Sequence, residues 1–252
     1  MKNYLFILIA TLSFNTAFSQ LNSGSIIYNE KINVHAMLPP QAQAYKDMIP
    51  EFREQKKELL FNESISKYAN KEAAPGEEEV KTNTQGNVQM RFKRMEDKSE
   101  TIYDIEKKEK LEFKEFMDRP FIITEENAMG EIKWKIGAGQ KEILGYICQE
   151  AIYFGEKDTV LAWFAPQIPV STGPRGMGNL PGMILEMDIN DGKTHIVATE
   201  IVAKEIDSKE LAIKGKGKKV TSEEFKTIVE EKQKEMKEMY GGNGNVMIRT
   251  RH

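Results

Sequence analysis

Cysteine and histidine are scarce in this chain, which contains one cysteine and three histidines among 252 residues. The single thiol, Cys148, has no second cysteine with which to form an intramolecular disulfide. His35, His195 and His252 are scattered, and none is paired at the spacing of zinc ligands. We therefore expect no metal site and no cofactor. Because Cys148 lies in an alternating apolar run, we expect it to be a small buried side chain rather than a reactive thiol.

The chain also lacks an excess of charge of one sign. It has 36 lysines and arginines against 39 aspartates and glutamates, and the two kinds are interspersed. A nucleic-acid-binding domain would carry a basic patch or stripe, which is missing here. We expect no nucleic-acid partner.

No apolar run reaches the ~20 residues that a membrane-spanning helix takes. The run over residues 4–14 follows Lys2 and precedes Ala17-Phe18-Ser19, whose small residues suit a cleavage site. This predicts a signal peptide over residues 1–19. Since Gln20 is not a cysteine, the mature chain has no acceptor for a lipoprotein anchor. We expect a periplasmic or secreted protein that is not an integral membrane protein.

The remaining sequence predicts one domain over residues 20–240 and a flexible tail over residues 241–252. Short strand-like runs follow one another with no helix between them, which favours antiparallel neighbours. A charged, apolar-poor stretch over residues 70–86 is expected to be a mobile hairpin tip, and Asn190-Asp191-Gly192 predicts a tight hairpin. The expected strands cover residues 23–35, 59–68, 88–95, 101–105, 110–116, 120–125, 132–136, 143–154, 160–165, 182–189 and 195–204.

Helices are expected near both ends of the domain. Residues 40–57 carry helix formers with Ala44, Met48 and Phe52 four apart, and Pro50 should kink that helix. Thr221 and Glu224 have capping-box spacing before a second helix. The predicted fold class is α+β, a large, curved, mainly antiparallel sheet that resembles a half-barrel. The outline is similar to that of periplasmic lipoprotein carriers, with the early helix partly covering the concave face.

Proline and glycine are concentrated between residues 163 and 187, so this segment should be a structured loop rather than a helix or strand. It contains WFAPQIPVSTGP (residues 163–174) and NLPGMILE (residues 179–186), and ILGYICQEA (residues 143–151) precedes it. These three motifs together resemble the signature of the GLPGLI family of exported bacterial proteins. Asn179 and Met183 depart from the family's glycine and leucine. The resemblance implies export but no known biochemical activity.

Two interpretations of this loop remain open. It could route the chain between sheet edges and plug the core. Alternatively, its apolar side chains could line the mouth of a pocket for an apolar ligand beside the early helix. The candidate ligand-binding residues are Ile168, Val170, Met177 and Leu180.

Catalytic patterns are weak. Ser171 and Thr172 lie in the loop and His195 follows it, but no nucleophile-elbow motif is present. The first hypothesis is a non-enzymatic envelope protein that binds an apolar or amphipathic ligand, such as a lipid or lipoprotein, or a partner protein. The alternatives are a hydrolase that uses Ser171 or Thr172 with His195, and a structural assembly factor of the cell envelope.

Overall fold

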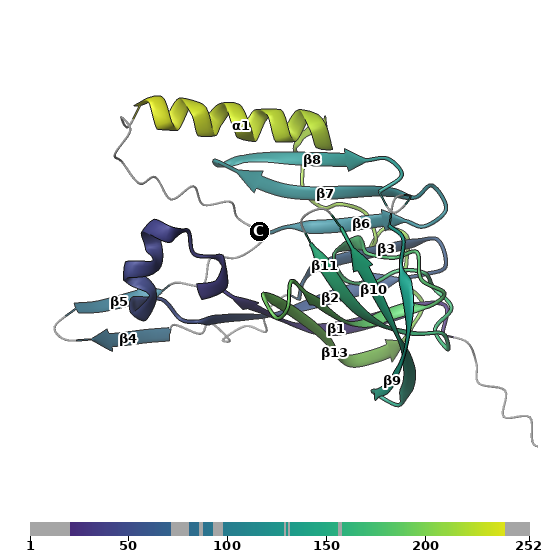
Figure 1. Cartoon of the computed structure of the whole chain (residues 1–252). Helices are drawn as coiled ribbons and strands as arrows, with labels where there is room; N and C mark the ends of the chain where they lie inside the picture. Colours follow the sequence, from purple (N-terminus) through teal and green to yellow (C-terminus); the bar gives the residue numbers. More distant parts are fainter. Residues whose placement is uncertain are drawn as a thin grey trace, which may run out of the picture.

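The computed structural model describes residues 21–71, 81–85, 88–92, 98–128, 130, 132–155 and 158–239. This part of the chain contains one 12-stranded sheet, a separate two-stranded sheet and one α-helix (Figure 1). The strands are β1 (Gly24–Asn33), β2 (Phe52–Phe61), β3 (Ile65–Asn70), β4 (Lys81–Gln85), β5 (Val88–Phe92), β6 (Glu100–Asp104), β7 (Glu109–Phe116), β8 (Arg119–Glu125), β9 (Lys135–Ile143), β10 (Tyr146–Phe154), β11 (Thr159–Ala165), β12 (Met183–Ile189), β13 (Thr194–Ala203) and β14 (Lys218–Thr221).

The large sheet has the order β14-β8-β7-β6-β3-β2-β1-β13-β12-β11-β10-β9, and β4 pairs with β5 in the small sheet. Every neighbouring pair in the large sheet is antiparallel except β14 and β8, which run parallel. Among the described residues, the helices other than α1 are short 3-10 turns. The predicted α+β class and the mainly antiparallel sheet are therefore confirmed.

The sheet curls around its main core. Ser66 on β3 lies 2.6 Å from the Thr172 hydroxyl, and the carbonyl of Thr172 accepts from Ile184 N on β12 at 2.9 Å. Four strand spacings of about 4.8 Å would separate β3 and β12 by roughly 19 Å in a flat sheet. One residue that bonds to both strands therefore requires strong curvature, which gives the sheet a concave inner face.

A long connection fills part of this inner face. We call residues 166–182, between β11 and β12, the proline loop; it includes the 3-10 turn η3 (Pro174–Gly176). Its backbone is fixed to β12 because Met183 donates to the carbonyl of Ile168 and Ile184 to that of Thr172, both at 2.9 Å. Trp134 also donates from Nε1 to the carbonyl of Gly178 at 2.9 Å. The loop is thus a packed layer of the core, with a defined path.

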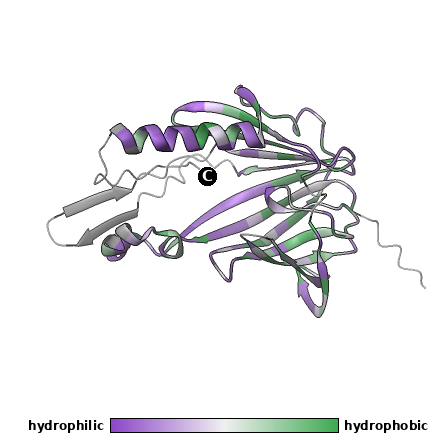
Figure 2. Cartoon of the chain, turned by 45° about the horizontal axis from the view of Figure 1, so that its top comes forward, coloured by the Kyte–Doolittle hydropathy of each residue, from purple (hydrophilic) through white to green (hydrophobic). Residues whose placement is uncertain are grey.

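The C-terminal helix α1 (Ser222–Met239) packs near the β14 edge, where it forms a second, smaller core. Phe225, Ile228 and Val229 contact buried side chains of β7, β8 and β14. The capping box is present, since Glu224 N donates to Thr221 Oγ1 at 3.1 Å and Thr221 N donates to Glu224 Oε2 at 2.9 Å. Figure 2 shows α1 as mainly hydrophilic with interrupting hydrophobic stretches, as expected of a helix that buries one stripe.

The early helix differs from the expected one. Residues 40–57 do not form a kinked α-helix; Pro40–Met48 is a 3-10 helix, η2, and β2 already begins at Phe52. Met48 and Phe52 are 42% and 40% exposed. In Figure 1, η2 lies at one end of the molecule near β4 and β5, not over the proline loop. Gln43, Ala44 and residues 46–48 are exposed, so no packed face stabilises an α-helix between Pro40 and Pro50.

Several expected strands also differ. The strand expected over residues 59–68 is the end of β2 and the start of β3, which pair as a hairpin about residues 62–64. The expected strand over residues 143–154 is a hairpin, because Leu144 and Gly145 form its turn with φ of 51° and 84°. The strand expected at Ile132 begins instead at Lys135. The short parallel strand β14 was not predicted, since its lysine-rich sequence has little strand character.

Several predictions lie outside the described residues. These are the signal peptide over residues 1–19, the tail over residues 241–252, and most of the hairpin tip expected over residues 70–86. Within the described ranges, the helices all fall short of the length and apolar character that a transmembrane helix requires.

Candidate functional site

The most unusual buried group is the carboxylate of Glu30, on the inner face of β1. Tyr28, Glu30 and Ile32 alternate on that face, and Glu30 is only 2% exposed. Its carboxylate accepts hydrogen bonds from Gln55 Nε2 at 2.9 Å and from the Tyr68 hydroxyl at 3.0 Å. The carboxylate is therefore supplied with donors from the two neighbouring strands, β2 and β3.

The third partner comes from the proline loop. Arg175 Nη2 lies 2.7 Å from Glu30 Oε1, and Arg175 Nε lies 3.4 Å from Oε2. Arg175 adopts a left-handed backbone with φ of 57° in the turn η3. This uncommon conformation places the guanidinium over the sheet, and the charge pair helps to offset its cost.

The local electrostatics keep Glu30 ionised. Burial would raise its pKa, but the charges and hydrogen bonds of Arg175, the charge of Lys57 and the Gln55 amide outweigh it and hold the pKa below the ordinary value. Lys57 is itself only 3% exposed. For Tyr68, burial and the adjacent Glu30 raise the pKa well above its ordinary value. Glu30 thus remains an anion and Tyr68 a neutral donor.

A second polar contact lies nearby between the sheet and the loop. Ser66 Oγ on β3 and Thr172 Oγ1 are 2.6 Å apart, and both side chains are buried. This pair and the Glu30–Arg175 pair attach the loop to β1 and β3 at two points. A buried acid that accepts hydrogen bonds from three neighbouring side chains is suited to holding the loop in place. It is poorly suited to general acid–base chemistry, which needs access to substrate and a pKa near the working pH.

The residues of the hydrolase hypothesis are not brought together. His195 is 39% exposed at its side chain, and its Nε2 lies 3.1 Å from Glu186 Oε1. The other oxygen of this carboxylate, Glu186 Oε2, pairs with Lys141 Nζ at 2.6 Å. Thr172 is fully buried and bonds to Ser66. Neither loop hydroxyl forms a hydrogen bond with His195, so the arrangement that would activate a nucleophile is missing in this conformation.

Three of the four candidate ligand-binding residues are fully or almost fully buried. Ile168, Val170 and Leu180 are 0%, 3% and 2% exposed and belong to the main core, and Met177 packs partly buried against it. They fill the interior beneath the loop, as expected if the loop plugs the core. Ligand binding by these side chains would require the loop to move.

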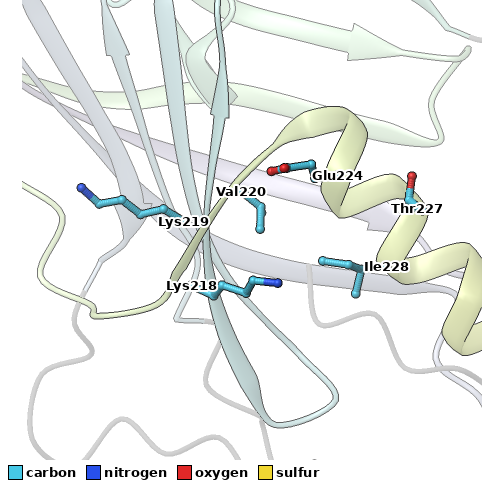
Figure 3. Close-up of a pocket in the computed structure, with 6 residues that line it drawn as sticks. All are labelled: Lys218, Lys219, Val220, Glu224, Thr227 and Ile228. Atoms are coloured by element: carbon cyan, nitrogen blue, oxygen red, sulfur yellow. The ribbon is translucent and has the colours of Figure 1, made fainter.

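A shallow cavity of about 340 Å³ lies elsewhere, between β14 and the first turns of α1 (Figure 3). In Figure 3 the side chains of Lys218 and Lys219 point to opposite sides of the strand, and Val220 and Ile228 face the gap. The one acid in its lining, Glu224, already accepts the capping hydrogen bond from Thr221. The cavity is therefore an opening at the helix start, with no set of converging reactive groups.

Cys148 is buried, as the sequence predicts. Burial raises the pKa of its thiol to about 11, with Lys141 opposing and Glu186 adding to that shift. Within the described ranges, no cluster of His, Cys, Asp and Glu has the geometry of a metal site.

The residues that the sequence interpretation missed are Glu30 and Arg175 with their partners. A signal for Glu30 existed, because a charged residue stands in the apolar series Ile26, Tyr28 and Ile32 of an alternating strand. Arg175 carried no comparable signal, since its role depends on where the loop crosses the sheet.

The architecture is thus a curled, mainly antiparallel sheet with a packed loop, and the partly exposed Arg175 of that loop pairs with the buried Glu30 on the inner face. The sequence model of the family described as N-glycanase peptide, N-terminal domain, matches residues 99–227, which are 129 of the 252 residues. The chain belongs to this family.

Two solved structures of PNGF-II, in the P21 and C2 space groups, are similar in fold. Each has a TM-score of 0.55 and 13% sequence identity over 82% of this chain. The chain covers only 33% and 32% of those two chains, so it spans about a third of their length. No curated protein matches the chain.

Proposed function

We propose that this protein is an exported, non-enzymatic protein of the cell envelope that acts by binding a partner protein. The observation that carries the proposal is the closed inner face of the sheet. Three of the four loop side chains that would line a ligand pocket are buried, and Glu30, the one buried acid among the described residues, is neutralised by neighbouring donors. Since the inner face is filled in this way, we infer that the described part of the chain binds its partner through the outer surface.

The family description supports this proposal. It concerns the N-terminal domain of an N-glycanase, and this chain spans about a third of the PNGF-II structures. We propose that the fold serves as an accessory module and that this chain is exported. The resemblance of residues 143–151, 163–174 and 179–186 to the GLPGLI family agrees with export to the periplasm or beyond.

Lipid analysis of the native protein separates this proposal from the lipid-carrier hypothesis. The protein is purified from the envelope fraction without detergent, denatured and extracted, and lipids are quantified by mass spectrometry. We expect no lipid in stoichiometric amount. One equivalent of lipid per chain, displaced by an environment-sensitive apolar probe, would instead establish a carrier, and it would require the loop to open.

A further inference from the structure

The helix α1 is attached to the sheet along only part of its length. The side chains that pack against the second core are Phe225, Ile228 and Val229, which lie in the first half of the helix and are half-buried. In the second half of α1, no described side chain belongs to this core. The sheet side chains of the second core are buried, at 3–5% exposed: Phe116, Phe121, Ile123 and Val220.

Phe225 makes the most specific of these contacts. Its ring centroid lies 5.9 Å from that of Phe116 and 5.2 Å from that of Phe121, both in edge arrangements. Lys114 Nζ lies 5.0 Å from the same centroid. Aromatic and cation–π contacts of this kind are directional but individually weak. Removal of this one ring should therefore loosen α1 selectively.

The contact between α1 and β14 is incompletely packed. The shallow cavity of about 340 Å³ lies between them, and Val220 and Ile228 face it from opposite sides (Figure 3). Protein interiors normally contain few voids larger than a water molecule, and side chains that line a gap lose dispersion contacts. The first turns of α1 are thus held less firmly than a filled interface would hold them.

The helix holds itself together without the sheet. Its capping box lies within residues 221–224, and the Lys232–Glu235 ion pair lies within the helix. With 18 residues, α1 is longer than the ~12–15 residues below which an isolated helix is marginal. Ser222 follows Thr221 of β14 with no loop between them. A released α1 would keep these bonds and would pivot at this junction.

The sheet in turn has its own attachments at this end. The main core and the second core share no residue. β14 pairs with β8, and the segment before β14 is fixed separately. There, Lys67 Nζ donates to the carbonyl of Ala212 at 2.7 Å and pairs with Glu100 Oε2 at 3.2 Å, while Leu211 is 2% exposed. None of these contacts involves α1, so they can persist when the helix leaves.

We propose that α1 is a displaceable cover. It moves away from the end of the sheet formed by β7, β8 and β14 as an intact helix, while the 12-stranded sheet stays folded. This opening uncovers an apolar patch made of the buried sheet residues of the second core. Openings of this kind occur where an element has few buried contacts and its neighbours have many. The inference does not depend on the proposed partner binding.

Hydrogen–deuterium exchange of the purified chain, followed by mass spectrometry, tests the proposal. In the wild type, α1 amides should exchange faster than those of β1 and β12, which open only with the whole sheet. Glu30→Gln should accelerate exchange in β1 and β12 roughly a hundredfold and leave α1 unchanged, because it weakens only the sheet. Phe225→Ala should accelerate exchange in α1 by about tenfold or more. The matched control is its exposed neighbour, Lys226→Ala, which should not.

Two results of this experiment would overturn the proposal. One is protection of α1 equal to that of β1 in the wild type, and the other is equal acceleration of both elements by Glu30→Gln. A further variant, Ile228→Pro, breaks the helix and so keeps α1 open. The chain's two tryptophans, Trp134 and Trp163, pack against the main core and report on the sheet. We expect Ile228→Pro to keep native tryptophan emission and a cooperative urea transition; loss of either would show that the sheet needs α1 and would also overturn the proposal.

Discussion

At the residue scale, we expect the loss of the Glu30 charge to lower the free energy of unfolding more than the loss of any other charge. In Glu30→Gln, Arg175 and the buried Lys57 lose the attraction of this carboxylate, and breaking a buried pair costs about 3–5 kcal/mol. We expect a value near the lower limit, because the Arg175 side chain is 40% exposed. Urea unfolding measures the loss.

Glu54→Gln is the matched control on β2. Its carboxylate is 54% exposed and lies 3.9 Å from Lys31 Nζ, so the substitution should change the free energy of unfolding by less than about 0.5 kcal/mol. Equal effects of the two substitutions would show that the Glu30 network contributes no more to stability than the exposed Glu54–Lys31 pair.

The same network predicts how stability depends on pH. The pKa of Glu30 is lower in the folded state than the ordinary value of 4.5, so the unfolded state binds its proton first as pH falls. Its contribution is therefore complete above about pH 4.5 and is lost as the pH falls through the lowered folded pKa. The wild type should lose stability over this acid range more steeply than Glu30→Gln. Parallel pH–stability curves for the two chains would contradict this.

The Cys148 thiol should be inert in the native protein. Its pKa of about 11 leaves little thiolate at neutral pH, and the side chain is fully buried. Ellman's reagent at pH 8 should react with the native chain many times more slowly than with the urea-unfolded chain. Rapid labelling without denaturant would mean that β10 opens readily.

At the element scale, substitutions at two turn glycines distinguish a steric clash from left-handed backbone strain. A Cβ at Gly182 would lie 2.3 Å from the carbonyl oxygen of Ala165, and φ there is 152°. Gly145 has φ of 84° but no atom within 4 Å of its Cβ position. Gly145→Ala should therefore cost only about 1 kcal/mol of left-handed strain. Gly182→Ala should cost clearly more, because the loop must also move. Thermal melts that rank the two in the opposite order would contradict the described loop path.

Local chemistry explains which elements were predictable. Asn190-Asp191-Gly192 and the Thr221–Glu224 box determine their turns within a few residues, and both are present in the structure. The Leu144-Gly145 turn was missed because leucine is an unusual residue at positive φ, so the apolar run appeared continuous. The early α-helix was wrong because helix-forming side chains between prolines found no core face to cover.

The Glu30 site depends on contacts that no local pattern determines. Glu30 and Arg175 are 145 residues apart, and they meet only because the loop crosses the curled sheet. The alternation of β1 marks Glu30 as an inward charge, but its partner follows from the topology.

At the scale of the whole molecule, the first prediction concerns processing. The small residues before Gln20 predict cleavage after Ser19. N-terminal sequencing of protein from the envelope fraction should begin at Gln20, cyclised or not. A chain that still carries Lys2 would contradict export by a cleaved signal peptide.

The central claim is that this protein works by binding another protein through its outer surface. The most direct test is its native size in a gentle envelope extract, separated on a sizing column and detected by immunoblotting. We predict that the wild-type chain elutes in a complex larger than a monomer and together with a different protein. Elution of the wild-type chain as a monomer would contradict the account.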